Sequence, residues 1–431
     1  MKPVIGFAGL THLGLVSALA AAAKGFRVIG YDSDAARVAE ISARRFPISE
    51  PELGEIANNV GDLISYSSGL SALRDCHTVY ISTDVPTDDN GASDLSGIGA
   101  LIEQVAVVLS PHASLVILCQ VPPGYTRSVR FPAERLFYQV ETLVFGVAIQ
   151  RALQPERLII GCAEPTRALP EPYQAFLSAF GCPIMPMRYE SAELCKISIN
   201  CCLVASVTVA NTLAELSESI GADWSEIAPA LRLDRRIGPY SYLKPGLGIA
   251  GGNLERDIAT VLRLAEVQGT EASLLNAFLI NSAHNRDWVL RILHQEVLDL
   301  QPQASLAVWG LAYKENTHST KNSQALALIA CLWPWPIRVF DPVVPAAAAA
   351  HPALAGARDA LDAARGADAL LIMTPWPDFK DIGPHDLSKV MKGDVIIDPY
   401  CVLTPAVVHA AGLRHFFRGA RHGLDRELVN A

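Results

Sequence analysis

Short apolar runs of strand length alternate with helical stretches at both ends of this chain, and this alternation limits the fold more than any other feature. Strands buried on both faces of a sheet have this continuous apolar character, and the helices between them cover the two faces. In the first third, the runs are KPVIGFAG, FRVIGYD, HTVYIST, SLVILCQ and RLIIG. The alternation predicts an α/β fold with a doubly wound parallel sheet.

The pattern changes at Tyr189, where one long helical segment begins. Apolar residues recur there at intervals of three to four up to Gly221, which stands where a C-cap glycine belongs. Two more helical stretches follow, LERDIATVLRLAEVQG and EASLLNAFLINSAHNRDWVLRILHQEVLDL. Alternation then returns with the strand candidates ASLAVWGLAYK, IRVFDP, ADALLIMTP and DVIIDPY. The Ala-rich segment PAAAAAHPALAGA is predicted to form a surface turn and a short helix.

A chain of 431 residues is too long for one ordinary core. We therefore expect two Rossmann-like, doubly wound parallel-sheet domains joined by a central helical domain with one long helix. The expected boundaries are 1–188, 189–300 and 301–431.

Composition excludes several classes of partner. The formal net charge is −9, and the basic residues form no block, so neither nucleic acid nor an anionic membrane is an expected partner. The nine cysteines are scattered, without zinc-ligand spacing, so we expect no metal site and a cytoplasmic location. The first residues are interpreted as strand, glycine turn and helix rather than a signal peptide, and no transmembrane helix is expected.

The segment GLTHLG follows the first strand and opens a helix, as a dinucleotide-binding turn does. Gly9 and Gly14 take the first and third glycine positions, and Asp32 ends the second strand. A carboxylate there accepts a ribose 2′-hydroxyl and repels a 2′-phosphate, which favours NAD over NADP. Thr11 takes the second glycine position and adds bulk near the pyrophosphate, so we expect weaker or shifted binding. A Rossmann-like domain that binds no dinucleotide is the alternative.

Further motifs follow in a fixed order: FPISEPELGEI, VPTDDNGASDLS, QVPPGYTRSV, ESAELCKISIN, DRRIGPYSYLKPGLGIAGGNLERD and VWGLAYKENTHSTKNS. Their order resembles the UDP-glucose/GDP-mannose dehydrogenase family over nearly the whole chain. The resemblance implies oxidation of the primary alcohol of a UDP- or GDP-sugar to a carboxylate with two NAD, in polysaccharide biosynthesis. It also implies a homodimer built on the central helix. In the family, a cysteine thiolate captures the intermediate aldehyde, so that the adduct can donate a second hydride.

The resemblance assigns catalytic roles to several residues. Lys196 and Asn200 match groups that stabilise oxyanion charge, and their spacing of four puts both on one helix face. Asp257 matches an aspartate held near the lysine and a water. Glu141 matches a glutamate that handles water and protons. The plainer interpretations are a solvated lysine, a surface or capping asparagine, a carboxylate at a helix start and a surface glutamate.

The resemblance also implies contacts with both ligands. The expected cofactor contacts are Gly9, Thr11, His12, Leu13, Gly14, Asp32, Val85, Pro86, Gln120 and Lys314, the last from the C-terminal sugar-nucleotide loop. The expected substrate contacts are Tyr242, Leu243, Gly246, Gly248, Gly251 and Lys321.

The residues that depart from the family pattern lie at positions that take part in catalysis or contact the cofactor. Asn253 takes the position of the nucleophilic cysteine, and an amide cannot act as a thiolate does. Val85 and Gln120 replace threonines that touch the cofactor. Cys119 and Cys195 lie nearest in the matched motifs, but buried structural thiols are the better interpretation for both.

Three functions remain open from the sequence. The first is an NAD-dependent nucleotide-sugar oxidoreductase limited to a two-electron alcohol/carbonyl step. The second is a redox-neutral, NAD-dependent epimerase or eliminating enzyme. The third is a sugar-nucleotide-binding relative without turnover.

Overall fold

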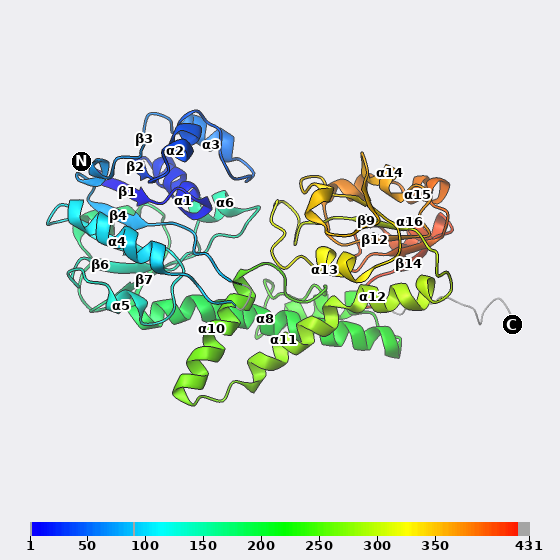
Figure 1. The fold of residues 1–431 in the computed structure, drawn as a ribbon. Helices are drawn as coiled ribbons and strands as arrows, with labels where there is room; N and C mark the ends of the chain where they lie inside the picture. The colour runs from blue at the N-terminus through cyan, green and yellow to red at the C-terminus, as the bar shows by residue number, and fades with distance from the viewer. Residues whose placement is uncertain (1, 89–90, 421–431) are drawn as a thin grey trace. The chain divides into compact units, whose positions relative to one another are not determined.

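The computed structural model describes residues 2–88 and 91–420, and the chain divides into two compact units, Met1–Ile199 and Asn200–Ala431. Each unit is built around its own sheet (Figure 1). The boundary between the units falls within the long helix α8, Tyr189–Ile220. This helix agrees with the segment expected from Tyr189 to Gly221, and Gly221 has a positive φ of 78°.

Within its described residues, the first unit has an eight-stranded sheet of order β3-β2-β1-β4-β5-β6-β7-β8. All neighbouring strands are parallel except β6 and β7. The strands are β1 (Val4–Ala8), β2 (Arg27–Tyr31), β3 (Ile64–Ser67), β4 (Thr78–Ile81), β5 (Ser114–Ile117), β6 (Leu136–Gln139), β7 (Leu158–Cys162) and β8 (Ile184–Arg188). Every predicted strand is present, and β3, β6 and β8 are additional.

Helices cover both faces of this sheet. One apolar core contains residues of α1, α3, α6 and α7, and another contains residues of α4 and the start of α8 (Figure 1). The strands of this sheet are therefore covered on both faces, as their continuous apolar runs predicted. The helical elements of the first unit are α1 (His12–Ala23), α2 (Ala35–Ser42), α3 (Leu53–Asn59), η1 (Leu70–Leu73), α4 (Ser96–Val108), α5 (Tyr125–Ser128), α6 (Ala148–Leu153) and α7 (Glu171–Ser178).

The second unit carries a parallel sheet, six-stranded over the part of the chain described, of order β11-β10-β9-β12-β13-β14. The strands are β9 (Leu306–Trp309), β10 (Ile337–Phe340), β11 (Leu354–Gly356), β12 (Ala369–Ile372), β13 (Val395–Ile397) and β14 (Arg414–Phe416). This order repeats the order of the first six strands in the N-terminal sheet. The Ala-rich segment forms the short turn η3 (Ala346–Ala348), as predicted, but its second half is the edge strand β11.

The remaining helices of the second unit include the two helical stretches predicted after the glycine loop. The elements are α9 (Trp224–Leu233), α10 (Asn253–Gln268), α11 (Ser273–Arg286), α12 (Trp288–Leu293), the π-helical turn η2 (His294–Leu298), α13 (Gln324–Cys331), α14 (Ala360–Ala364), η4 (Pro377–Asp381), α15 (Pro384–Val390) and α16 (Pro405–Ala410).

No transmembrane helix was expected, yet α8 is long and apolar enough to cross a membrane by length and composition alone. A core helix of a soluble protein meets the same criterion. One face of α8 carries the buried polar side chains Glu193, Asn200 and Asn211. Such groups are costly to place in lipid without partners, so packing inside the protein accounts for this face.

Candidate active site

The glycine turn after β1 has the close packing that a dinucleotide-binding turn requires. Gly9 has a φ of 99°, and a Cβ on it would lie 2.8 Å from the backbone nitrogen of Thr83. A Cβ on Gly14 would lie 1.8 Å from the carbonyl oxygen of Gly9, so α1 packs directly against the end of the strand. Both glycines are therefore required by the backbone geometry, and they fit the first and third roles of the motif.

Asp32 lies at the carboxyl end of β2, where a ribose-binding carboxylate belongs. Its Oδ2 accepts hydrogen bonds from the backbone N–H of Leu10, at 2.8 Å, and from Arg37 Nη1, at 2.9 Å. Its Oδ1 accepts the backbone N–H of Asp34 at 3.0 Å. The carboxylate is thus held in one orientation beside the glycine turn, and it fits the ribose end of NAD. The partner Arg37 was not predicted from the sequence.

The first residues of α1 point their side chains into the protein. His12 and Leu13 are buried, so only their backbone is available to a ligand at the helix start. His12 Nε2 lies 2.8 Å from Glu50 Oε1, and the His12 ring lies 4.2 Å from the ring of Phe145. His12 therefore anchors the turn to the body of the domain, a contact that the motif alone did not predict.

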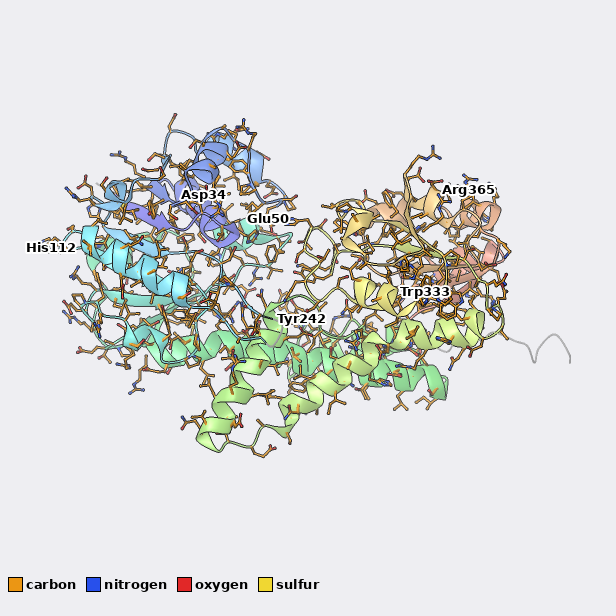
Figure 2. The ribbon with its side chains drawn as sticks, viewed as in Figure 1. Asp34, Glu50, His112, Tyr242, Trp333 and Arg365 are labelled. Atoms are coloured by element: carbon orange, nitrogen blue, oxygen red, sulfur yellow. The ribbon has the colours of Figure 1, made fainter. Side chains whose placement is uncertain are left out.

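Glu50 is a buried carboxylate in the segment between α2 and α3 (Figure 2). It accepts the backbone N–H groups of Gly146, at 3.0 Å to each oxygen, and of Ala148, at 3.2 Å. Burial raises the pKa of the Glu50 carboxyl, but the hydrogen bonds from His12, Gly146 and Ala148 outweigh it and hold the pKa below its usual value. Glu50 thereby fixes the loop that follows β6.

That loop also carries Glu141, which forms an ion pair with Lys196 of α8. Lys196 Nζ lies 3.2 Å from Glu141 Oε2, and the two side chains are only 12% and 16% exposed. The structure therefore brings together two of the predicted catalytic groups. Neither residue is an ordinary surface residue, because both side chains are largely shielded from water.

Glu193 is a further buried carboxylate, one turn before Lys196 on α8. It accepts the backbone N–H of Gly124 at 2.6 Å and that of Thr126 at 2.8 Å. These bonds fix the loop QVPPGYT, which begins with Gln120, to the helix that carries Lys196. The motif ESAELCKISIN contained this glutamate, but its spacing gave no sign of the partners almost 70 positions away.

Val85, Pro86 and Gln120 follow β4 and β5, the strands on the far side of β1 from Asp32. The carboxyl ends of parallel strands meet at one edge of a sheet, which is where open α/β sheets bind ligands. All three predicted cofactor contacts therefore lie at the same edge as the glycine turn.

In the second unit, Asn200 and Asp257 are hydrogen-bonded to each other. The side-chain amide of Asn200 donates to Asp257 Oδ2, and Arg256 Nε donates to Oδ1 at 3.3 Å. Asp257 is only 1% exposed. It does not cap α10, whose N-cap is Gly252, so the interpretation of Asp257 as a capping carboxylate is wrong.

The glycine loop before α10 is closely packed. A Cβ on Gly248 would lie 2.6 Å from the carbonyl oxygen of Ser282, and one on Gly251 would lie 2.9 Å from the ring of Tyr313. Both glycines have positive φ, of 87° and 78°. A Cβ on Gly246 would lie 3.3 Å from the ring of Tyr400, and the Gly246 N–H donates to Asn211 Oδ1 at 2.8 Å. The loop therefore has one conformation, set by its neighbours.

Asn253, at the position of the catalytic cysteine, and the predicted substrate contacts Tyr242 and Leu243 differ in exposure. Asn253 is exposed and begins α10. Tyr242 is half-exposed in the segment after α9 (Figure 2). Leu243 is buried and its carbonyl oxygen accepts the indole N–H of Trp224 at 2.7 Å, so it also stabilises the helical region.

Lys314 and Lys321 lie on the loop after β9. The Lys314 ammonium lies 5.8 Å from the centre of the Tyr313 ring, and Tyr313 packs on Gly251. Next to Lys321, Asn322 donates to the carbonyl oxygen of Gly251 at 3.0 Å and to Glu255 of α10. Both lysines are thus on a loop that contacts the start of α10.

The second sheet repeats the glycine-and-aspartate frame of the first. Gly310 has a φ of 90° and follows β9, and Asp341 follows β10, as Gly9 and Asp32 follow β1 and β2. Asp341, however, accepts hydrogen bonds from the backbone N–H groups of Leu311, Ala312, Val343 and Val344 and from the indole N–H of Trp376. These five donors, compared with three on Asp32, satisfy the Asp341 carboxylate within its own domain and indicate a structural role.

Of the two thiols nearest the matched motifs, Cys119 is a poor nucleophile. Cys119 is buried and its Sγ donates to the carbonyl oxygen of Ile81 at 3.2 Å. Burial raises the pKa of the Cys119 thiol to about 12. Cys195 is half-buried. Among residues 2–88 and 91–420, no group of three or more His, Cys, Asp or Glu side chains is placed to hold a metal ion.

Three models of one family match this chain in succession. They are described as the NAD binding domain, the central domain and the UDP binding domain of the UDP-glucose/GDP-mannose dehydrogenase family, and they match residues 3–176, 190–283 and 307–405.

Curated proteins and solved structures agree with this match. The UDP-glucose 6-dehydrogenase TuaD of Bacillus subtilis is 28% identical over 95% of this chain and 91% of its own length. The UDP-glucose 6-dehydrogenase of Pseudomonas aeruginosa is 28% identical, with 92% and 93% covered. A UDP-glucose dehydrogenase structure from Pyrobaculum islandicum superimposes with a TM-score of 0.84 at 23% identity, covering 98% of both chains.

These matches run through the glycine turn, the Lys196 helix, the loop before α10 and the second sheet. The fold is shared with solved dehydrogenases, and the domain that holds Gly9, Gly14 and Asp32 is the NAD binding domain. The chain therefore belongs to the UDP-glucose/GDP-mannose dehydrogenase family of NAD-dependent nucleotide-sugar dehydrogenases.

Proposed function

We propose that this protein oxidises a CH–OH group of a UDP- or GDP-sugar by two electrons and stops at the carbonyl. The observation that carries the proposal is the pair of fixed polar contacts, Glu141 with Lys196 and Asn200 with Asp257. Lys196 and Asn200 are four residues apart on α8, and this spacing puts them on one helix face.

NAD fits the turn formed by Gly9 and Gly14 with Asp32 at its ribose, and when bound it accepts the two electrons. The chain's own groups handle the substrate oxygen. The Lys196 ammonium and the Asn200 amide hold the hydroxyl and stabilise the negative charge that develops on its oxygen. Asp257 accepts the hydroxyl proton through a water molecule. The Glu141 carboxylate pairs with the Lys196 ammonium and keeps it in place on α8.

The second oxidation requires a nucleophile that makes the aldehyde a donor again. Asn253, at the start of α10, has no such group, and the Cys119 thiol is held neutral by burial. The product therefore leaves as an aldehyde or ketone, or the same groups reduce a carbonyl in the reverse direction. We also propose a cytoplasmic role in polysaccharide biosynthesis, which the resemblance to the family supports.

A second candidate is a binding relative without turnover, and the contact between Asp84 and the start of α1 favours it. Asp84 Oδ2 accepts the backbone N–H of His12 at 3.2 Å, at the position where a dinucleotide phosphate binds. A protein whose cofactor site is filled by its own carboxylate could bind a sugar nucleotide without oxidising it.

The test counts the NADH formed per sugar nucleotide consumed, across UDP-, GDP-, CDP- and dTDP-sugars. The proposal predicts one NADH per sugar. Two would show that another group replaces the cysteine and would overturn the two-electron limit. Altered sugar without NADH would favour the redox-neutral route, and unaltered sugar with measurable binding would favour the binding relative.

We also propose that α8 forms a homodimer. Val209, Leu213, Leu216 and Ile220 are 54%, 41%, 50% and 67% exposed. Their spacing of four, three and four residues places them on one stripe, the pattern of a helix that packs against another helix. A second copy of α8 would cover this exposed apolar stripe.

A further inference from the structure

The N-terminus of α1 is occupied by a carboxylate of the chain itself. The Asp84 side chain accepts the His12 N–H at 3.2 Å, and the Asp84 backbone N–H donates to Thr11 Oγ1 at 2.9 Å. Thr11 is the N-cap residue of this twelve-residue helix, but its hydroxyl makes no capping bond to it. Thr11 instead holds the loop that carries Asp84 against the helix start.

We propose that Asp84 is an internal competitor for the pyrophosphate of the dinucleotide. A helix N-terminus binds anions because its first N–H groups have no partners within the helix and the helix dipole is positive there. In this chain a carboxylate already uses the first of these groups. A bound pyrophosphate at the same place would be repelled by it, so the cofactor binds only after Asp84 has moved away.

The exposure of Asp84 makes such movement possible. Its side chain is exposed, in contrast to the nearby Glu50, which is buried and held by several donors. Displacing Glu50 would leave a buried charge without partners, which is costly, whereas Asp84 can turn into water. Asp84 therefore sets the affinity for the cofactor, while Glu50 keeps the turn in place.

This inference rests on the NAD-binding domain and not on the proposed two-electron chemistry. Asp84 and Thr11 together discriminate between ligands with and without a pyrophosphate at the phosphate end of the cofactor site. Asp32 and the ribose end are not affected. The consequence is a specific pattern among ligands. The Asp84 carboxylate should weaken the binding of ligands that contain a pyrophosphate, and it should leave the binding of other ligands unchanged.

The test is a calorimetric titration of the full-length protein with NAD, ADP-ribose and adenosine, at low and at high salt. Asp84→Asn keeps the shape of the side chain and removes its charge. We expect this variant to bind NAD and ADP-ribose about tenfold more tightly at low salt, less so at high salt, and adenosine as the wild type does. Thr11→Gly, which releases the loop, should change the affinities in the same direction.

Glu103→Gln is the matched control, because Glu103 is an exposed carboxylate on α4 of the same domain. Its affinities should equal those of the wild type, and thermal melting of every variant establishes folding. Equal NAD affinity in the wild type and Asp84→Asn would overturn the inference, as would an equal gain for adenosine. A gain for NAD in a protein that yields no NADH from any sugar would keep this inference and reject the proposed function.

Discussion

The side-chain amide of Asn200 donates a hydrogen bond to the buried carboxylate of Asp257, across 57 positions of the chain. The contact ties α8 to α10 within the second unit. Because Asp257 is almost fully buried, its charge depends on such donors for its stability.

Replacing Asn200 should therefore destabilise the protein. Asn200→Ala leaves one oxygen of Asp257 without this donor, which costs about 1–3 kcal/mol of unfolding free energy. Urea unfolding measures the loss. Ser198→Ala, an exposed position on the same helix, is the control and should leave the midpoint unchanged. An unaltered midpoint in Asn200→Ala would mean that water or Arg256 satisfies the carboxylate.

Lys196 should act on the rate rather than on substrate binding. Lys196→Met removes the positive charge that stabilises the substrate oxygen, and we expect kcat to fall ~10²–10³-fold with little change in KM. Steady-state kinetics on the sugar nucleotide that gives NADH in the panel measures both constants. Lys389→Met removes an exposed lysine on α15 and should change neither. A rise in KM alone would show that Lys196 only binds substrate.

Introducing a thiol at the start of α10 should restore the second oxidation. In Asn253→Cys, the thiolate can capture the aldehyde, and we expect NADH per sugar to rise from one towards two. Asn253→Ser is the matched control, since a hydroxyl of the same size is far less nucleophilic. If both variants form one NADH per sugar, other residues around position 253 also prevent the second oxidation.

The buried thiols should make the protein less stable at high pH. Burial raises the pKa of Cys76 and of Cys119 to about 12, from an ordinary value of 9.0. The unfolded chain then loses these protons at lower pH than the folded chain, so the unfolding free energy falls between about pH 9 and 12. Urea titrations across this range, compared with Cys119→Ala, measure it. A flat profile in the wild type would contradict the shift.

A charge on the exposed stripe of α8 should dissociate the dimer. Leu216→Glu puts a carboxylate in the centre of the proposed interface, where it cannot be solvated, and we expect a monomer by light scattering. Val107→Glu changes an equally apolar residue, 85% exposed on α4, and should leave the dimer intact. A wild-type monomer at micromolar concentration would reject the interface.

Much of the fold was predictable because its strands are uniformly apolar and its long helix has a clear period. Of the missed strands, β3, β8 and β11 are short or mixed in character, whereas β6, LFYQ, is apolar and buried like the predicted strands. In β3, ISYS, every second residue is polar, and β8, IMPMR, contains a proline and is half-exposed. The edge strand β11, LAG, has no apolar run at all. Each is held by its neighbour in the sheet, and that partner cannot be recognised from local sequence.

A site residue could be predicted only where a recognised motif assigned it a role. Glu141, Lys196, Asn200 and Asp257 were each identified singly, and the structure adds the pairing. The supporting carboxylates were not assigned a role, although Glu50 lay within a recognised motif. Their partners are backbone N–H groups, which every residue carries, so no side-chain pattern marks the contact.

The two sheets repeat one frame, yet they use its aspartate differently. Asp341 accepts five donors from its own domain, whereas Asp32 accepts three and lies beside the glycine turn of the NAD binding domain. A change at Asp341 should therefore appear as a folding defect of the second unit, and a change at Asp32 as weaker cofactor binding.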